Sequence, residues 1–191
     1  MVANDIVDLE YSRKHKNFSR PRLITKLFSD KEQQYILNSD DVFFNCCYLW
    51  SIKESAYKLY VQSSSERFFR PDLFQINLDH TSAEVTFKSF KCLVKTEITK
   101  DFIYSEAFWK KTNHLSSTFM LSSTDYAVQS RETRNKLIDN MSLQLGVESS
   151  SLSIKKSSNG IPSMYYYDLP LNSSISLTHH GRFGAYSYSL K

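Results

Sequence analysis

The chain has 191 residues, of which 41% are hydrophobic and 14% aromatic, so it can bury a core and is not intrinsically disordered. Its net charge of +4, without a dense basic run, does not require a nucleic-acid partner. No apolar stretch reaches the ~20 residues of a membrane-spanning helix, and the acidic N-terminus does not resemble a secretory signal. Three cysteines make no disulfide framework. We therefore expect a cytoplasmic protein that binds neither membrane nor nucleic acid.

The first 108 residues are predicted to form a buried strand, three helices and a four-stranded meander. A capping box, Ser29 followed three residues later by Glu32, marks the start of the second helix. The third helix lacks glycine and proline and carries apolar residues at helical spacing. In chain order the predicted elements are Val2–Leu9, Pro21–Leu27, Ser29–Leu37, Phe43–Val61, Leu73–Leu78, Glu84–Phe87, Leu93–Ile98 and Ile103–Phe108.

The rest of the chain repeats this plan in smaller form. Residues 109–128 are polar and serine-rich and are predicted to be a linker that contains one short strand. A helix, Arg131–Leu145, stops at Gly146. Strands follow at Leu152–Lys156, Met164–Tyr167, Ser174–Thr178 and Phe183–Leu190. The pattern predicts an α+β fold with two halves, residues 1–108 and 129–191, joined by the linker into one globular unit.

The third predicted helix holds the residues best suited to chemistry. Glu54 and Lys58 are four residues apart and share a helix face, with Trp50 one turn earlier. An exposed i,i+4 ion pair is the ordinary interpretation of this spacing. Here the pair lies on the same side as Trp50 and Tyr57, so we expect it to face a partly enclosed surface, where a functional role is more common.

Asp5 lies in the first predicted strand and is a candidate metal ligand. Placed opposite Glu54, its carboxylate would make an oxygen-donor site for Mg²⁺, which binds one or two carboxylates together with phosphate oxygens. The alternative is that Asp5 only caps the end of the strand.

A second polar segment, Thr178-His179-His180-Gly181-Arg182, lies near the C-terminus. Adjacent histidines in extended chain point in opposite directions, so they are not expected to chelate one metal together. One histidine with a neighbouring threonine and arginine suits phosphate oxygens. A turn with surface histidines is the alternative interpretation.

Together these segments resemble the 4′-phosphopantetheinyl transferase superfamily. The most specific motif of that family, W-x-x-K-E-(A/S)-x-x-K, is met in full by Trp50–Lys58. The other similar segments are Asp5-Ile6-Val7, Phe28–Glu32, Gly160-Ile161-Pro162 and Thr178–Gly181. The resemblance covers nearly the whole chain and implies two halves related by a pseudo-twofold axis, each with helix packed on a small antiparallel sheet.

The order of these segments differs from that of the longer, surfactin-type members, in which the G-x-P and Ser-His segments come before the Asp strand. Here they come last, so the resemblance implies a circular permutation relative to the surfactin type. A permuted chain should have termini that lie close together, with strand Phe183–Leu190 beside strand Val2–Leu9. The small holo-acyl-carrier-protein synthase type has the same order but is shorter and usually trimeric. We expect a monomer.

The sequence departs from the family pattern at four positions. Asn4 replaces the usual glycine before the Asp strand, and Val7 occupies the place of a third acidic ligand. Ile161 replaces the basic residue of the G-K-P turn, and Thr178 replaces serine but keeps its hydroxyl. The metal site would therefore have two protein carboxylates.

The resemblance implies a transfer of 4′-phosphopantetheine from coenzyme A to a carrier-protein serine, with release of 3′,5′-ADP. Asp5 and Glu54 would hold Mg²⁺. Glu54, directly or through a water on the metal, would accept the serine proton, with Glu32 as the alternative base, and Lys58 would stabilise or protonate the leaving phosphate. Coenzyme A would be bound by Lys53, Arg131, Gly160, Pro162, Thr178 and His179. The cleft between the halves would place Asp5, Glu54 and Lys58 opposite Arg131 and His179.

The implied partners are coenzyme A and an acyl or peptidyl carrier protein of fatty-acid or secondary-metabolite synthesis. Carrier proteins are generally acidic around their serine, which agrees with the net positive charge of this chain. A non-catalytic module that binds coenzyme A or a carrier protein is the principal alternative function, and a basic nucleic-acid-binding domain is a weaker one.

Overall fold

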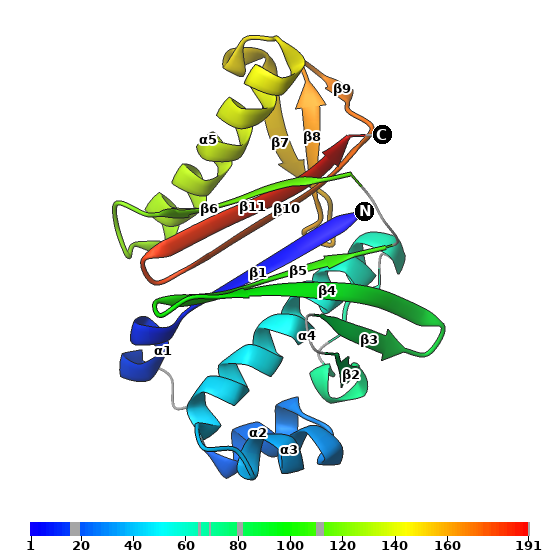
Figure 1. The fold of residues 1–191 in the computed structure, drawn as a ribbon. Helices are drawn as coiled ribbons and strands as arrows, with labels where there is room; N and C mark the ends of the chain where they lie inside the picture. The colour runs from blue at the N-terminus through cyan, green and yellow to red at the C-terminus, as the bar shows by residue number, and fades with distance from the viewer. Residues whose placement is uncertain (16–19, 65, 69, 80–81, 110–112, 191) are drawn as a thin grey trace.

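The computed structural model describes residues 1–191 except 16–19, 65, 69, 80–81, 110–112 and 191. The described chain forms two halves, one above the other in Figure 1, with the strands of both halves at the centre of the molecule. Among the described helices, none has both the length and the apolar character needed to cross a membrane.

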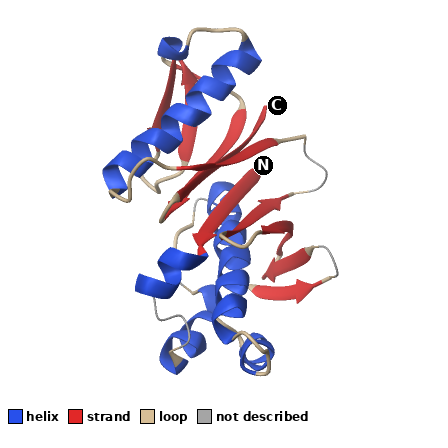
Figure 2. Cartoon of the chain, turned by 60° about the vertical axis from the view of Figure 1, so that its left-hand side comes forward, coloured by secondary structure: helices blue, strands red, loops and turns tan. Residues whose placement is uncertain are grey.

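The first half is a five-stranded antiparallel sheet with helices on one side (Figures 1 and 2). Its strand order is β1-β5-β4-β3-β2, so β1 lies at one edge. The helices are α1 (Leu9–His15), α2 (Pro21–Leu27), α3 (Asp30–Leu37) and α4 (Val42–Ser64), and a short 3₁₀ turn, η1, spans Pro71–Leu73. The strands are β1 (Val2–Asp8), β2 (Gln75–Leu78), β3 (Ala83–Phe87), β4 (Phe90–Ile98) and β5 (Phe102–Phe108).

The core of this half lies between α4 and the sheet. Alternate residues of β3 and β4, among them Val85, Cys92 and Val94, are buried, as expected for strands with one covered face. Helix α4 is buried along most of its length, with Leu49, Ile52 and other apolar side chains in one large cluster. It is therefore a central helix rather than a surface one.

The second half packs one helix, α5, against two three-stranded sheets of order β10-β11-β6 and β7-β8-β9. Its smaller core is formed by Leu137 and Met141 of α5 with Ile175 and Tyr188 of the sheet. The elements are β6 (Leu115–Met120), α5 (Tyr126–Leu145), the 3₁₀ turn η2 (Ser149–Ser151), β7 (Leu152–Lys156), β8 (Pro162–Tyr166), β9 (Leu169–Pro170), β10 (Ser173–His180) and β11 (Phe183–Leu190).

The predicted α+β class and all the predicted helices and strands are present. Helix α1 is not among the predicted elements; its last turn carries Arg13, Lys14 and His15. The strand β6 lies inside the predicted linker 109–128 and pairs with β11, so this stretch supplies an edge of the second sheet. Helix α5 begins earlier than predicted, because Asp125 caps it by accepting a hydrogen bond from the Val128 N–H.

The halves meet where the free edge of β1 faces the side chains of β10. The backbone N–H groups of Val2 and Asn4 donate to the hydroxyls of Ser174 and Ser176, each at 3.0 Å. Further along, the Asp8 N–H donates to His180 Nδ1 at 3.0 Å. Residue numbers rise together on both strands, so β1 and β10 run parallel and are joined by side chains instead of a backbone ladder.

Strand β11 lies beside β1, as expected, but the hydrogen bonds to the β1 backbone at this interface come from β10. Besides its ladder with β5, β1 is hydrogen-bonded to β10, because the alternate polar side chains of β10 reach the β1 backbone. Strand β11 contacts β1 by apolar packing, with Phe183 and Ala185 in one cluster with Ile6.

The two ends of the chain lie near each other in both Figure 1 and Figure 2. Ser174 of β10 is hydrogen-bonded to Val2 and is also the strand partner of Ser189. Strand β10 is therefore next to both the first strand, β1, and the last strand, β11. This arrangement is the one that a permuted order of segments requires.

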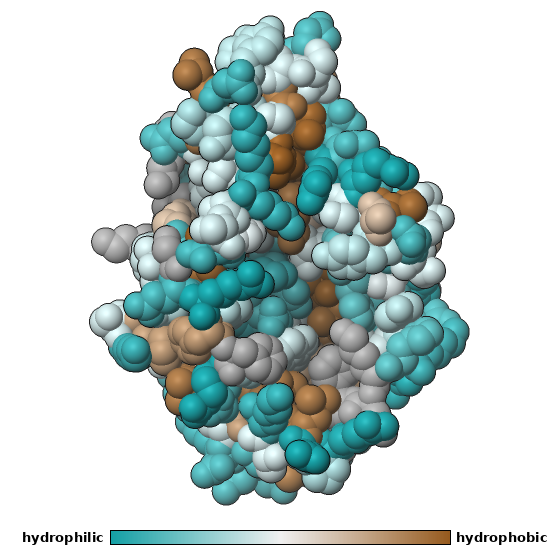
Figure 3. Space-filling view, turned by 180° about the vertical axis from the view of Figure 1, so that it is seen from behind, coloured by the Kyte–Doolittle hydropathy of each residue, from teal (hydrophilic) through white to brown (hydrophobic). Residues whose placement is uncertain are grey.

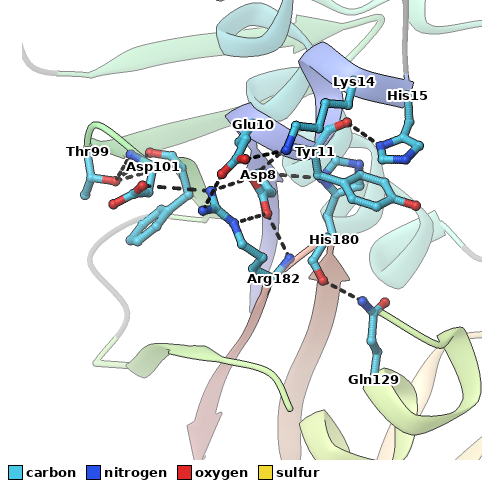
Figure 4. A network of polar contacts seen from close by, with 12 residues as sticks. Asp8, Glu10, Tyr11, Lys14, His15, Thr99, Asp101, Gln129, His180 and Arg182 are labelled. Carbon is cyan, nitrogen blue, oxygen red and sulfur yellow. Dashed lines mark hydrogen bonds and ion pairs between the residues drawn. The ribbon is translucent and has the colours of Figure 1, made fainter. Parts of the chain in front are cut away.

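The turn between β10 and β11 is fastened to β1 by Asp8, as Figure 4 shows. The Asp8 carboxylate accepts hydrogen bonds from the Arg182 backbone N–H at 2.8 Å and from the Arg182 guanidinium at 2.9 Å. Burial alone would raise the pKa of Asp8, but these bonds hold it below its usual value. Gly181 precedes Arg182 with a positive φ of 58° and packs directly against Asp8 and Tyr11.

Replacing Gly181 with alanine tests how tightly this turn is packed. A Cβ there would lie 2.5 Å from Asp8 Oδ2 in a left-handed backbone, so Gly181→Ala should lower the free energy of unfolding by about 3 kcal/mol or more. Gly146→Ala is the matched control, since that glycine also has positive φ but nothing near its Cβ position; it should cost about 1 kcal/mol. Urea unfolding measures both variants; an equal loss of unfolding free energy in the two would contradict the tight packing around Gly181.

Candidate functional site

Two connected hollows lie where β1, α4 and β10 meet. The smaller, about 170 Å³, is lined by Asp5, Ile6, Val7, Trp50, Glu54, Thr178, His179 and His180. The larger, about 350 Å³, lies between α4, the N-terminal part of α5, β10 and the turn before β8. Thr178 and His179 line both, so together the hollows form one cleft between the two halves. The face seen in Figure 3 is hollowed near its middle, where hydrophilic residues predominate.

Asp5 and Lys58 form an ion pair at the junction of the two hollows. Lys58 Nζ donates to Asp5 Oδ1 at 2.9 Å and to the Asn4 carbonyl at 3.0 Å. The Thr178 hydroxyl donates to the same Asp5 oxygen at 3.3 Å. These contacts hold one oxygen of Asp5 and keep the Lys58 ammonium at the wall of the larger hollow, with 30% of its side chain exposed.

Glu54 lines the smaller hollow with Asp5 and is half-buried on α4. Two carboxylates on adjacent walls are the donor set that suits Mg²⁺, which takes few protein ligands and completes its shell with water and phosphate oxygens. No cluster of three or more His, Cys, Asp and Glu side chains with metal-binding geometry occurs among the described residues. The donor set therefore fits a magnesium ion held by two protein carboxylates and otherwise by its substrate.

The larger hollow is surrounded by positive charge. Its cationic lining side chains are Lys58, Arg67, Arg134 and Lys156. Tyr57 and Tyr126 add aromatic surface, and Gly160, Ile161 and Pro162 form a turn at one wall. A cleft that combines several cations with aromatic rings suits a ligand that carries both phosphates and a flat ring.

The pKa of His179 is affected by this positive charge. Burial lowers its pKa below the ordinary value, and the positive charges of Lys58, Lys156 and Arg134 lower it further. Its imidazole Nδ1 lies 2.9 Å from Gln129 Oε1, and the Tyr126 ring meets it edge-on with 4.9 Å between centroids. An entering anion would be attracted by the same cations.

The expectation that Lys53 binds coenzyme A is not supported by its position. Lys53 points away from the cleft into the core, where its side chain is 1% exposed. Its ammonium lies 2.7 Å from Glu32 and also donates to the carbonyls of Pro71 and Phe74. Every contact is internal, so this lysine of the helix motif holds the first half together.

Glu32, the alternative base, belongs to the same buried group and not to the cleft. Its two oxygens accept hydrogen bonds from the Ser29 N–H at 2.8 Å and the Ile76 N–H at 3.0 Å, in addition to the Lys53 pair. A carboxylate committed to these partners joins α3, α4 and β2. It does not line the cleft.

Arg131 also lies outside the cleft. It borders a separate shallow hollow with Val128, Asn135 and other residues on the outer face of α5. Arg134, three residues later, lines the larger hollow instead, together with Ser130 and Thr133. The predicted site residues that line the cleft are Asp5, Glu54, Lys58, Gly160, Pro162, Thr178 and His179, whereas Lys53 and Arg131 do not line it.

The family model for the 4′-phosphopantetheinyl transferase superfamily matches residues 1–128. The chain belongs to this superfamily. A solved structure described as an apo-ACPS from Chronobacterium ammoiniagenes is similar over 56% of this chain and 93% of that chain, with 14% sequence identity and a TM-score of 0.45. No curated protein matches the chain significantly.

Sequence reasoning missed several cleft residues of this superfamily member, among them Arg134. A signal for it was present, because Tyr126, Ser130 and Arg134 precede the buried Leu137 at helical intervals of three and four and so share its face. Arg131 lies on a different face of the helix. Arg67 lies on a connecting segment, where no periodicity indicates direction, and Lys156 is the last residue of β7.

The buried position of Lys53 leads to a stability prediction. Lys53→Met removes the cation and leaves the Glu32 charge buried without its partner, so the free energy of unfolding should fall by about 3–5 kcal/mol. Adding Glu32→Gln to that variant removes the uncompensated charge and should recover part of the loss. Urea unfolding measures both; a loss below about 1 kcal/mol in Lys53→Met would contradict the internal role.

Proposed function

We propose that this protein transfers 4′-phosphopantetheine from coenzyme A to a serine hydroxyl of an acyl or peptidyl carrier protein and releases 3′,5′-ADP, with Mg²⁺ as cofactor. The observation that carries the proposal is the joined cleft. A pair of carboxylates in a small hollow lies next to a cationic hollow, and Thr178 and His179 belong to both.

The cationic hollow is suited to the phosphates of coenzyme A. Lys58, Arg134 and Lys156 would bind phosphate oxygens, and His179 would add a hydrogen bond from β10. Tyr126 and the turn at Gly160–Pro162 would border the adenine. The residues would hold the pyrophosphate beside the carboxylates, so that positioning contributes much of the rate.

Asp5 and Glu54 would hold the magnesium ion, which when bound would neutralise charge on the pyrophosphate. Asp5 is prepared for this by Lys58 and Thr178, which fix one of its oxygens. Because the two carboxylates come from different elements, β1 and α4, the packing of these elements sets the distance between the carboxylates.

Proton transfer would be divided between Glu54 and Lys58. Glu54 would accept the proton of the attacking serine hydroxyl, and its half-buried position on the smaller hollow leaves room for the hydroxyl to approach. Lys58 would stabilise the leaving phosphate with its ammonium and supply a proton. Since both residues lie on one face of α4, the helix would set the distance between base and acid.

The partners would be an acidic carrier protein and coenzyme A, and the chain would act as a monomer in the cytoplasm. The net charge of +4 favours encounter with an acidic carrier. Both walls of the cleft come from one chain, which supports a site that needs no second copy.

The test is incubation of the full chain with coenzyme A, Mg²⁺ and a panel of apo carrier proteins, followed by mass spectrometry of the carriers. A gain of one phosphopantetheine group on any carrier supports the transferase. Tight coenzyme A binding without transfer to any carrier would instead favour a non-catalytic module. Salt-dependent nucleic-acid binding without coenzyme A affinity would exclude both.

Glu54→Gln keeps the size of the side chain and removes its charge and basicity. Transfer should slow by at least ~10²-fold, because both metal binding and proton acceptance need the carboxylate. Glu84→Gln is a suitable control, since Glu84 pairs with Lys91 on the surface of the sheet. A wild-type rate in Glu54→Gln would remove this residue from the mechanism.

The two arginines of α5 make a matched pair. Arg134→Ala should raise the KM for coenzyme A about 10-fold or more, because it removes a charged hydrogen-bond donor from the phosphate hollow. Arg131→Ala should leave KM unchanged, since Arg131 lies on the outer face. Steady-state kinetics with one carrier compares them; the reverse pattern would contradict the position of the binding site.

A further inference from the structure

The His179 imidazole is hydrogen-bonded to the side chain of Gln129, which lies in the first turn of α5. Gln129 is 5% exposed, and its amide bridges two groups. Oε1 lies 2.9 Å from His179 Nδ1, and Nε2 donates to the Gly181 carbonyl at 2.6 Å. Figure 4 shows the amide directed from α5 toward the turn between β10 and β11.

The Gly181 carbonyl determines which way the Gln129 amide faces. A carbonyl oxygen only accepts hydrogen bonds, so the group next to it must be the amide nitrogen. The amide oxygen then faces His179, and since it also only accepts, Nδ1 must carry a hydrogen. A flipped amide would bring two acceptors together at the Gly181 carbonyl.

We propose that Gln129 is a positioning residue that holds neutral His179 in the Nδ1–H tautomer and thereby presents Nε2 to the substrate cleft. With Nδ1 bonded to Gln129 and Tyr126 against the ring, Nε2 is the nitrogen that remains for the two hollows that His179 lines. The inference rests on the proposed function, because it concerns how that cleft meets its ligand.

The fold fixes this bridge from both ends. Gly181 has positive φ, and the next residue, Arg182, is held by Asp8 of β1, so the carbonyl cannot turn away from Gln129. The Thr133 hydroxyl donates to the Gln129 carbonyl within α5. The tautomer of one cleft residue is therefore set by a turn and a helix that do not themselves touch the carboxylate pair.

The test begins with the tautomer itself. In protein labelled with ¹⁵N at histidine, long-range proton–nitrogen spectra distinguish a protonated ring nitrogen from an unprotonated one; the His179→Gln variant assigns the signals. The wild-type chain, measured above the pKa of His179, should show a protonated Nδ1 and an unprotonated Nε2. A protonated Nε2 would overturn the proposal, whatever the activity.

Gln129→Met removes both hydrogen bonds at similar volume, and the Nδ1–H preference should be lost. The KM for coenzyme A should then rise about 10-fold, while kcat changes by less than about threefold. Retention of the tautomer and of KM in folded Gln129→Met would overturn the proposal.

Ser142→Ala is the matched control, because Ser142 is another buried side chain of α5 that bonds to its surroundings, near the other end of the helix. It should change neither the tautomer nor KM. A shift of the tautomer in Ser142→Ala as large as in Gln129→Met would mean that general loosening of α5 is responsible, and would overturn the proposal. Absence of transfer by the wild-type chain would reject the proposed function and leave the tautomer measurement valid.

Discussion

The buried free edge of β1 is the constraint on which the rest of this structure depends. An edge strand inside a protein must satisfy its backbone N–H groups, because an unpaired buried donor is costly. Here Ser174, Ser176 and His180, at alternating positions on β10, supply acceptors to that edge. The same interaction joins the halves and sets their register. It brings Thr178 against Asp5 and so places the larger, cationic hollow next to the smaller hollow that holds the two carboxylates.

The hairpin of β10 and β11 is thus a shared part of both halves. On one side Asp8 binds the backbone and side chain of Arg182, and on the other Gln129 binds the Gly181 carbonyl. A turn held at both sides has little freedom, and His179, two residues before Gly181, takes its orientation from it. Preorganised groups of this kind need little rearrangement when a charged ligand enters.

The helix motif W-x-x-K-E-S-x-x-K divides its charged residues between the core and the cleft. Lys53 points into the core and pairs with Glu32, whereas Glu54 and Lys58 line the cleft. A buried ion pair contributes little net stability compared with an apolar pair, but it penalises arrangements in which the partners separate. The Glu32 carboxylate also receives the Ile76 N–H, so the pair specifies how α3, α4 and β2 meet.

The sequence by itself determined most of the elements, the α+β class, the superfamily and seven of the cleft residues, since hydrophobic period, caps and a nine-residue motif are local signals. Gly146 ends α5 through such local chemistry, as predicted, whereas the cap at Asp125 was not predicted. Only the tertiary structure decided that Lys53 is internal, that Arg134 and not Arg131 lines the cleft, and that β10 is the strand of the second half bonded to β1. The physical reason is that periodicity relates residues within one element, while the partner of each face depends on packing. Helix α4 is covered on nearly all sides, so its pattern of apolar residues does not show which polar residue is left for the cleft.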